Sequence, residues 1–303
     1  MIELNTDHFI QRIRDLTKPL HPDNAGHETR LKPIRDIRCV AFDFYGTMFI
    51  SAVGDIGVDE EQQQKNAAGF TEALEDTGFE ITNSSAGERG ITLFEQTVKS
   101  YIESARREGV DYPEPNIISV WTDVLNDLVS SGDIRGQVRK EEAIRFGIEF
   151  EFRVNDIWPV PGLKKILKGL MELDIELGII SNSQYYTPIA FETLLGSSPS
   201  DFGFNDKLLI WSYRAKCKKP SLDLYRLFIE AAGKETLQPR QILYVGNDIR
   251  KDIQPAKEAG MHTALYVGDQ RSIRHQPEDL KEREYQPDLI ISDLSQIADC
   301  LTN

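Results

Sequence analysis

Cysteine is scarce in this sequence of 303 residues: Cys39, Cys217 and Cys300 are the three present, and they lie far apart. An odd number at such spacing provides neither a disulfide framework nor a cysteine pair of metal-binding type, and this usage suits a reducing cytoplasm. Cys39 falls inside an apolar strand pattern, so we expect it to be a core residue rather than a reactive one.

Long apolar runs and a surplus of positive charge are also missing. The first 16 residues carry acids early and contain no uninterrupted apolar stretch, which argues against a signal peptide or a membrane span. The formal net charge is −14, and an acidic surface repels nucleic acids and anionic membranes. Hydrophobic content of 40% and charged content of 28% are ordinary for a globular protein. We therefore expect a cytoplasmic protein without nucleic-acid or membrane partners, whose oligomeric state the sequence leaves open.

Residues 1–36 have the pattern of an N-terminal extension. Phe9, Ile10, Ile13 and Leu16 have helical spacing, and prolines interrupt the chain that follows. This pattern predicts a short amphipathic helix packed on the core. A docking arm for a partner is the alternative interpretation.

Residues 51–154 differ in texture, because apolar residues recur there every three or four positions. This period predicts helices at 60–77, 88–108, 116–131 and 139–151, ended by Gly78, Gly109 and Gly132. The apolar stripes are typical of the core of a helical bundle.

Residues 37–50 and 155–303 alternate between strand and helix patterns. We expect strands at 37–42, 175–180, 208–211, 241–245, 263–267 and 289–291. Helices are predicted at 162–171, from about 188, at 221–232 and at 249–259. Strands that alternate with helices indicate an α/β fold with a parallel sheet covered on both faces.

Asp43 follows the first of these strands and is itself followed by a turn at Gly46. A buried strand that ends in a carboxylate brings one acid to the edge of the sheet where ligands bind. A carboxylate held there can attack a phosphorus or carbon centre and form a covalent intermediate. The alternative is a strand-end aspartate that caps a turn.

Three later segments place polar residues at similar strand ends. Ser181 and Asn182 close a strand, where a hydroxyl and backbone amides can bind an anionic oxygen; a helix-capping serine is the alternative. Lys219 precedes a proline and a helix start and could neutralise phosphate or crowded carboxylates. Asp248 and Asp252 open a helix four residues apart, which suits Mg²⁺ or simply the helix dipole.

Together, and in this order along the chain, the four segments resemble the haloacid dehalogenase (HAD) superfamily, in its subfamily with a helical cap inserted after the first strand. The resemblance covers about residues 37–50 and 155–299. It implies a Rossmann-like doubly wound parallel sheet as the core, residues 51–154 as the cap, and an aspartyl-enzyme intermediate. It also implies Mg²⁺ and a small-molecule phosphorylated substrate.

The resemblance also implies roles for residues at the reacting centre. Asp43 would be the nucleophile, and Thr47 would form a hydrogen bond near it. Ser181 and Asn182 would bind the transferring phosphoryl group, and Lys219 would offset the charge of phosphate and carboxylates.

The metal site implied by the resemblance would comprise Asp43, Asp248 and the backbone carbonyl of Tyr45, with Asp252 in support. Tyr45 departs from the family phosphatases, which usually carry a second aspartate there as general acid and base. Tyrosine at this position, and Tyr225, are similar to the 2-haloacid dehalogenases, which need no metal.

The retained acid pair favours a phosphoryl substrate, whose charge must be neutralised. We therefore rank a Mg²⁺-dependent phosphatase first and a metal-independent 2-haloacid dehalogenase second. A catalytically impaired binding protein ranks third.

Overall fold

The computed structural model describes residues 6–23, 26–51, 60–274 and 286–302. Its centre is a six-stranded sheet in the order β11-β10-β9-β2-β7-β8, in which every neighbouring pair is parallel. In sheet order the strands are Leu289–Ile291 (β11), His262–Tyr266 (β10), Ile242–Gly246 (β9), Cys39–Phe42 (β2), Glu176–Ser181 (β7) and Phe204–Trp211 (β8). The predicted α/β fold with a parallel sheet is confirmed.

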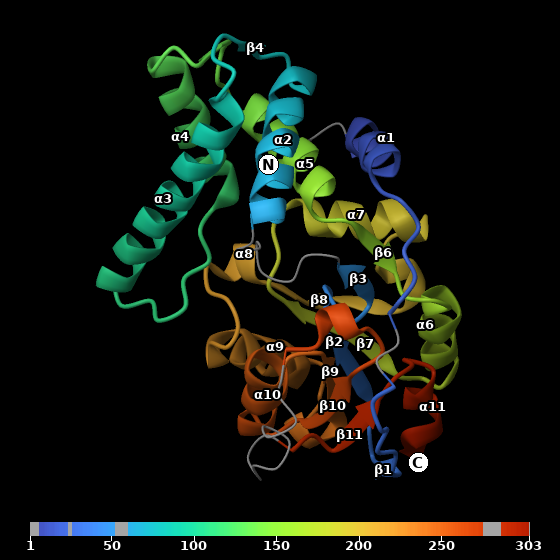
Figure 1. The fold of residues 1–303 in the computed structure, drawn as a ribbon. Helices are drawn as coiled ribbons and strands as arrows, with labels where there is room; N and C mark the ends of the chain where they lie inside the picture. The colour runs from blue at the N-terminus through green and yellow to red at the C-terminus, as the bar shows by residue number, and fades with distance from the viewer. Residues whose placement is uncertain (1–5, 24–25, 52–59, 275–285, 303) are drawn as a thin grey trace.

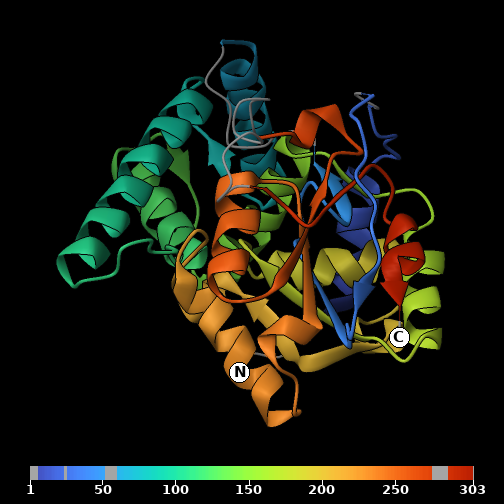
Figure 2. The same ribbon diagram turned by 90° about the horizontal axis from the view of Figure 1, so that it is seen from below.

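Helices cover both faces of this sheet because its central strands are apolar on both sides. Val40 and Phe42 of β2 pack with α6, α7 and α11, whereas Cys39 and Ala41 pack with α9 and α10. In Figure 2 the orange helices α9 and α10 lie across the sheet from yellow-green α6 and red α11. Cys39 is fully buried, as expected. These helices span Leu163–Glu172 (α6), Tyr186–Leu195 (α7), Leu222–Lys234 (α9), Gln254–Glu258 (α10) and Gln296–Cys300 (α11).

The strand order reverses direction at β2, and this reversal positions the site. From β2 the chain runs outward through β7 to β8 and then returns to β9, on the other side of β2. In open α/β sheets a ligand crevice forms beyond the carboxyl ends of the strands at such a switch point. The residues that follow β2 and β9 therefore face a common crevice.

Four further helices form a bundle on one side of the molecule (Figure 1). They are Glu60–Asp76 (α2), Ala86–Arg107 (α3), Ile117–Ser130 (α4) and Lys140–Val154 (α5), close to the predicted helices. The bundle has its own hydrophobic core, in which Phe70, Trp121, Phe146 and Phe150 make mutual ring contacts. None of the helices within the described ranges is long and apolar enough to cross a membrane.

Short strand pairs that the sequence did not predict tie these parts together. Phe49–Ser51 (β3) and Ile157–Pro159 (β6), which flank the bundle in sequence, pair antiparallel. Glu80–Ile81 (β4) pairs with Ile134–Arg135 (β5) inside the bundle, and Ile34–Arg35 (β1) pairs with Leu301–Thr302 (β12). Strands of two or three residues are too short to show an alternating pattern.

The N-terminal extension contains the predicted amphipathic helix, Thr6–Leu16 (α1). Phe9 and Ile13 are buried in the bundle's hydrophobic cluster, and α1 packs against both α5 and α7. Arg12 forms ion pairs with Asp76 and Glu149. The helix therefore packs on the core, as expected, and also contacts the bundle.

Two predictions need correction. The helix expected over 249–259 begins as a π-helical turn, Ile249–Ile253 (η3), before α10. The strand expected at 208–211 begins earlier, at Phe204. The remaining short elements are Ser200–Phe202 (η1), Ser212–Ala215 (α8), Pro239–Gln241 (η2) and Gln270–Ser272 (η4).

The bundle core provides a test of the fold. Phe70 is fully buried, so Phe70→Ala should lower the free energy of unfolding by about 3–5 kcal/mol, because it removes apolar contacts and leaves a cavity. The matched control is Leu227→Ala on α9, where the side chain is 42% exposed and the change should stay within about 0.5 kcal/mol. Denaturant titration measures both, and equal effects would contradict this packing.

Candidate active site

A cavity of about 570 Å³ lies where the residues after β2 and β9 meet the helical bundle. Six of the eight residues predicted from the sequence line it, namely Asp43, Tyr45, Asn182, Lys219, Asp248 and Asp252. Thr47 and Ser181 are fully buried and do not line the cavity. The fold thus brings six of the predicted residues together around one cavity, and the other two are buried beneath its lining.

Asp43 is held at the end of β2 by its backbone, whose N–H donates to the carbonyl of Val245 at 2.9 Å. Its carboxylate lies 2.7 Å from the ammonium of Lys219, and the Ser181 hydroxyl donates to the Asn182 carbonyl at 3.3 Å. Burial raises the pKa of Asp43 to about 6, although the charge of Lys219 opposes this shift. The carboxylate is therefore fixed in direction, and the single ammonium of Lys219 does not fully offset the effect of burial on its negative charge.

Lys219 is the one ammonium in the centre of this group. Its Nζ lies 2.7 Å from Asp43 Oδ1, 2.5 Å from Asp252 Oδ1 and 3.2 Å from the Tyr244 hydroxyl. Burial lowers the pKa of Lys219, but the charges of Asp252 and Asp43 outweigh it and leave that pKa raised. Asn182 fixes the lysine's backbone, since its side-chain oxygen accepts from the Lys219 N–H at 2.7 Å.

Asp252 has both carboxylate oxygens engaged. Oδ1 accepts a hydrogen bond from the Lys219 ammonium and lies 3.1 Å from the Tyr244 hydroxyl. Oδ2 accepts hydrogen bonds from the backbone N–H groups of Asn247 and Asp248. Gly246 makes this approach possible, because a Cβ there would lie 2.4 Å from the carboxyl carbon of Asp252. Asp252 thus positions both the lysine and the loop after β9.

Asp248 caps η3 with one oxygen only. Its Oδ1 accepts the backbone N–H groups of Arg250 at 2.8 Å and Lys251 at 2.9 Å. Among the described residues, none donates a hydrogen bond to its Oδ2. Burial, followed by the charge of Asp252, raises the pKa of Asp248. This carboxylate has an oxygen to offer to a ligand in the cavity.

Thr47 supports the neighbouring turn through its hydroxyl. Its hydroxyl lies 3.3 Å from the Asn247 side-chain oxygen, and Asn247 in turn donates to the carbonyl of Ser272. Gly46 adopts a φ of +79°, and a Cβ there would clash with Asn247 at 2.8 Å. Glycine is therefore needed where the chain leaves β2.

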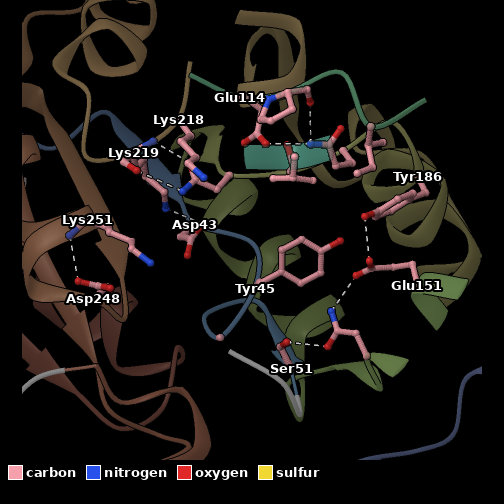
Figure 3. Close-up of a pocket in the computed structure, with 18 of the residues that line it drawn as sticks. Asp43, Tyr45, Ser51, Glu114, Glu151, Tyr186, Lys218, Lys219, Asp248 and Lys251 are labelled. Carbon is pink, nitrogen blue, oxygen red and sulfur yellow. Dashed lines mark hydrogen bonds and ion pairs between the residues drawn. The ribbon is translucent and has the colours of Figure 1, made fainter. Parts of the chain in front are cut away.

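Tyr45 extends from this turn toward the helical bundle. Its hydroxyl lies 2.9 Å from the hydroxyl of Thr187 on α7. Burial, together with the charge of Glu151, raises the pKa of Tyr45 above its usual value. Figure 3 shows the ring between Asp43 on one side and Glu151 with Tyr186 on the other. The phenol is thus a poor proton donor to a group bound at Asp43.

The cavity is also lined by two acidic residues that the sequence did not single out. Glu151 accepts hydrogen bonds from Tyr186 at 2.8 Å and from Asn155 at 2.9 Å. Glu114 accepts from Gln184 at 2.9 Å and from Ser212 at 2.8 Å. In the sequence Glu151 reads as an ordinary acid of an amphipathic helix, so no signal marked it.

The connection between α3 and α4 lies against the loop that carries Lys219. Pro113 bridges to Cys217, and the Lys218 N–H donates to the Tyr112 carbonyl at 2.8 Å. Lys218 lines the cavity and is only partly exposed. The bundle and the core therefore share this part of the wall.

Carboxylates on the described part of the cavity wall could serve as ligands of a divalent cation. Within the described ranges, no three His, Cys, Asp or Glu side chains group closely enough to hold a metal ion by themselves. The chain offers instead two carboxylates, Asp43 and Asp248, with raised pKa values on one cavity wall. Mg²⁺ is commonly held by one or two carboxylates, with waters and substrate phosphate completing its octahedron. The donor set fits that kind of site.

Comparison with known proteins identifies the family. Residues 37–260 match the model of the haloacid dehalogenase-like hydrolases. The chain belongs to this family of hydrolases. Both the fold and the hydrolase class expected from the four motifs are thereby confirmed for this HAD-like hydrolase.

Individual relatives of this HAD-like hydrolase differ in their activities. It is 30% identical over 145 residues to a glyceraldehyde 3-phosphate phosphatase of Methanocaldococcus jannaschii, covering 48% of this chain and 57% of that protein. The chain thus spans little more than half the length of this curated relative.

Among solved structures, the 2-haloacid dehalogenase of Pseudomonas syringae pv. Tomato DC3000 has a TM-score of 0.55 at 18% identity, covering 87% of this chain and 97% of that one. A HAD phosphatase from Thermococcus onnurineus has a TM-score of 0.48 at 17% identity, covering 87% of this chain and 97% of that one. The first likeness supports the fold of the HAD-like hydrolase.

The central lysine of the HAD-like hydrolase can be tested by its effect on stability. Lys219→Met should lower the free energy of unfolding by about 3–5 kcal/mol, because it leaves the buried carboxylates of Asp43 and Asp252 without an ammonium. Lys234→Met is the matched control, since that lysine pairs with Glu230 at the surface. Urea unfolding in EDTA measures both. If the two variants unfold at the same urea concentration, the central ion group does not stabilise the fold.

Proposed function

We propose that this HAD-like hydrolase cleaves a small phosphate monoester with the help of Mg²⁺, through a phosphorylated Asp43. The observation that carries the proposal is Asp248, a buried carboxylate with one oxygen left over, on the same cavity wall as Asp43. Lys219 is already shared between Asp43 and Asp252. Displacement of a halide would need no carboxylate besides Asp43. Binding of a phosphoryl group together with a metal ion would need a second carboxylate as a metal ligand.

The positive charge on the cavity wall supports an anionic substrate. Lys218, Lys219, Lys251 and Arg274 line the cavity, and all four come from the core. Figure 3 shows Lys218, Lys219 and Lys251 on the same side of Tyr45 as Asp43. A phosphoryl group at Asp43 would therefore lie among basic side chains.

In the proposed reaction Asp43 attacks phosphorus, and the bond from phosphorus to the ester oxygen breaks. The departing oxygen takes a proton from water, since Tyr45 is not placed or tuned to donate one. A water molecule then attacks phosphorus, the bond from phosphorus to Asp43 breaks, and the carboxylate and inorganic phosphate are released with a proton. Lys219 holds the Asp43 carboxylate in direction during both steps.

The proposed metal ligands are Asp43, Asp248 and the backbone carbonyl of Tyr45. Bound Mg²⁺ would neutralise charge on the phosphoryl group and orient it. Asp252 has no oxygen to spare, so we assign it a supporting role through Lys219 and the backbone N–H groups of Asn247 and Asp248. Thr47 supports the turn behind Asp43 rather than the substrate.

We assign the helical bundle, residues 51–154, the role of a cap over an active site in the core of residues 37–50 and 155–303. Residues from α3, α4 and α5 line the cavity opposite Asp43, which supports this division. A closed cavity would exclude water that competes with the intended reaction. Residues 1–36 would then be an extension whose helix α1 braces the bundle against the core.

The phosphatase activity of the Methanocaldococcus relative favours phosphate esters as substrates. The alternative is a 2-haloacid dehalogenase, which Tyr45 favours. The other residue suggestive of that activity, Tyr225, does not line the cavity, and its hydroxyl donates to the Lys251 carbonyl at 2.7 Å. A binding protein without catalysis is the third interpretation, and it leaves the arrangement around Asp43 without a purpose.

Metal dependence separates the two enzyme activities. We expect hydrolysis of aryl phosphates with Mg²⁺, and loss of that activity in EDTA or in Asp43→Asn. Asp248→Asn should raise the Mg²⁺ concentration needed for half-maximal rate, because it removes one proposed ligand. The rates are measured by phosphate release, with Asp43→Asn as the control for contaminating phosphatases.

Hydrolysis of a 2-haloacid that continues in EDTA, with no phosphate release in Mg²⁺, would replace the phosphatase by a dehalogenase. Inactivity toward both substrate classes would favour the binding protein.

Two substitutions test whether Tyr45 acts as an acid. Tyr45→Phe should keep kcat/KM for aryl phosphates within about threefold, because good leaving groups gain little from a proton donor. Tyr45→Asp should raise the rate on alkyl phosphates relative to aryl phosphates, because it supplies a carboxylic acid near the leaving oxygen. A loss of about 10²-fold or more in Tyr45→Phe would make the phenol a general acid after all.

A further inference from the structure

The cavity differs in charge between its two ends. Its basic lining residues belong to the core, as described above, whereas the lining residues from α2 to α5 and their connections include no lysine or arginine within the described ranges. That outer wall is apolar and aromatic, with Phe94, Trp121 and Phe150 among its members, and it contains the carboxylates of Glu114 and Glu151. A ligand that spans the cavity therefore meets lysine and arginine side chains beside Asp43, Asp248 and Asp252 on the core side, and carboxylates without lysine or arginine on the side of the bundle.

Glu151 is the carboxylate without a cation nearby. It accepts hydrogen bonds from Tyr186 and Asn155, and it forms no ion pair with any described residue. Burial raises the pKa of Glu151, because nothing charged compensates it there. A protonated amine at this point would supply the missing charge, and hydrogen bonds to charged groups are stronger than those between neutral groups.

Glu114 differs in this respect, although it also lines the cavity. The charge of Lys218 attracts it, and Gln184 and Ser212 donate to its two oxygens. Its negative charge is therefore already opposed from the core side. The two glutamates form a matched pair in which one is compensated and the other is not.

We propose that the cavity selects a phosphate monoester whose leaving alcohol is aromatic or apolar and carries a protonated amine, with the ammonium bound at Glu151. This inference rests on the proposed function for the position of the phosphate at Asp43. Tyr45 lies between Asp43 and Glu151, so the body of the ligand passes beside its ring (Figure 3). Trp121 and Phe150 are among the residues that line the same cavity, and aromatic rings attract cations.

The cavity volume agrees with a ligand of this size. About 570 Å³ falls within the range of small-molecule sites, roughly 300–1,000 Å³. A phosphate, one aromatic ring and an aminomethyl group fit that volume. The ring would replace water against the apolar wall, and the two charged ends would set the orientation.

The test compares 4-(aminomethyl)phenyl phosphate with 4-(hydroxymethyl)phenyl phosphate, which share the aryl phosphate and differ in the cationic group. With Mg²⁺, the wild-type protein should show a kcat/KM at least about tenfold higher for the amine, as expected for a charged hydrogen-bond partner. Glu151→Gln should bring the ratio close to one. Glu114→Gln should keep the ratio, because the charge of Glu114 is already opposed by Lys218.

Binding is measured separately by calorimetry on Asp43→Asn, with the same two compounds. If neither compound is hydrolysed but the amine binds at least about tenfold more tightly, the proposed function fails and the amine site stands. Equal affinities and equal kcat/KM values for the two compounds would overturn the amine site, whether or not phosphate is released. A preference that survives Glu151→Gln would overturn the assignment to Glu151.

Folding of Glu151→Gln is checked by circular dichroism. If that variant does not fold, the wild-type protein is compared on 4-(aminomethyl)phenyl phosphate and its N-acetyl derivative, which has lost the positive charge. Loss of the preference on acetylation supports the proposal. A rate and an affinity that are unchanged by acetylation overturn it.

Discussion

The candidate active site of this protein depends on one buried ammonium shared between two carboxylates. Lys219 lies within ion-pair distance of Asp43 and Asp252, and all three side chains are almost wholly removed from solvent. Burial of charge is unfavourable unless the partners are held closely, which explains why so much local structure is devoted to holding them. Asn182 fixes the backbone of the lysine, and Gly246 gives Asp252 the space to reach it.

The sequence predicts the core well because its signals are local. A buried strand followed by an acid and a glycine marks Asp43, and the same logic marks Asp248 after β9. Tyr244 was not predicted, although its hydroxyl lies beside Lys219 and Asp252, because a tyrosine within an apolar run is typical of any strand. Glu151 was missed for a similar reason, since its importance arises from a cavity formed by segments far apart in the chain.

Tyr45 illustrates how one position joins the two halves of the molecule. Its backbone belongs to the turn after β2, while its ring packs in both the core and the bundle clusters, and its hydroxyl meets α7. A carboxylate at this position would be left in a largely apolar contact, so the tyrosine suits the packing as well as the chemistry. The same side chain lies between Asp43 and Glu151 (Figure 3).

The pairing of β3 with β6 has a consequence for how this chain could diversify. Ser51 and Ile157, which flank the helical bundle in the sequence, are register partners in that small ribbon. Because the two ends are neighbours, the chain leaves the core and returns to it at almost the same point, whatever the length of the segment between them. The helices between them could therefore be exchanged for another module with little change at the end of β2, whereas the loop of Lys219 would lose its contacts with Tyr112 and Pro113.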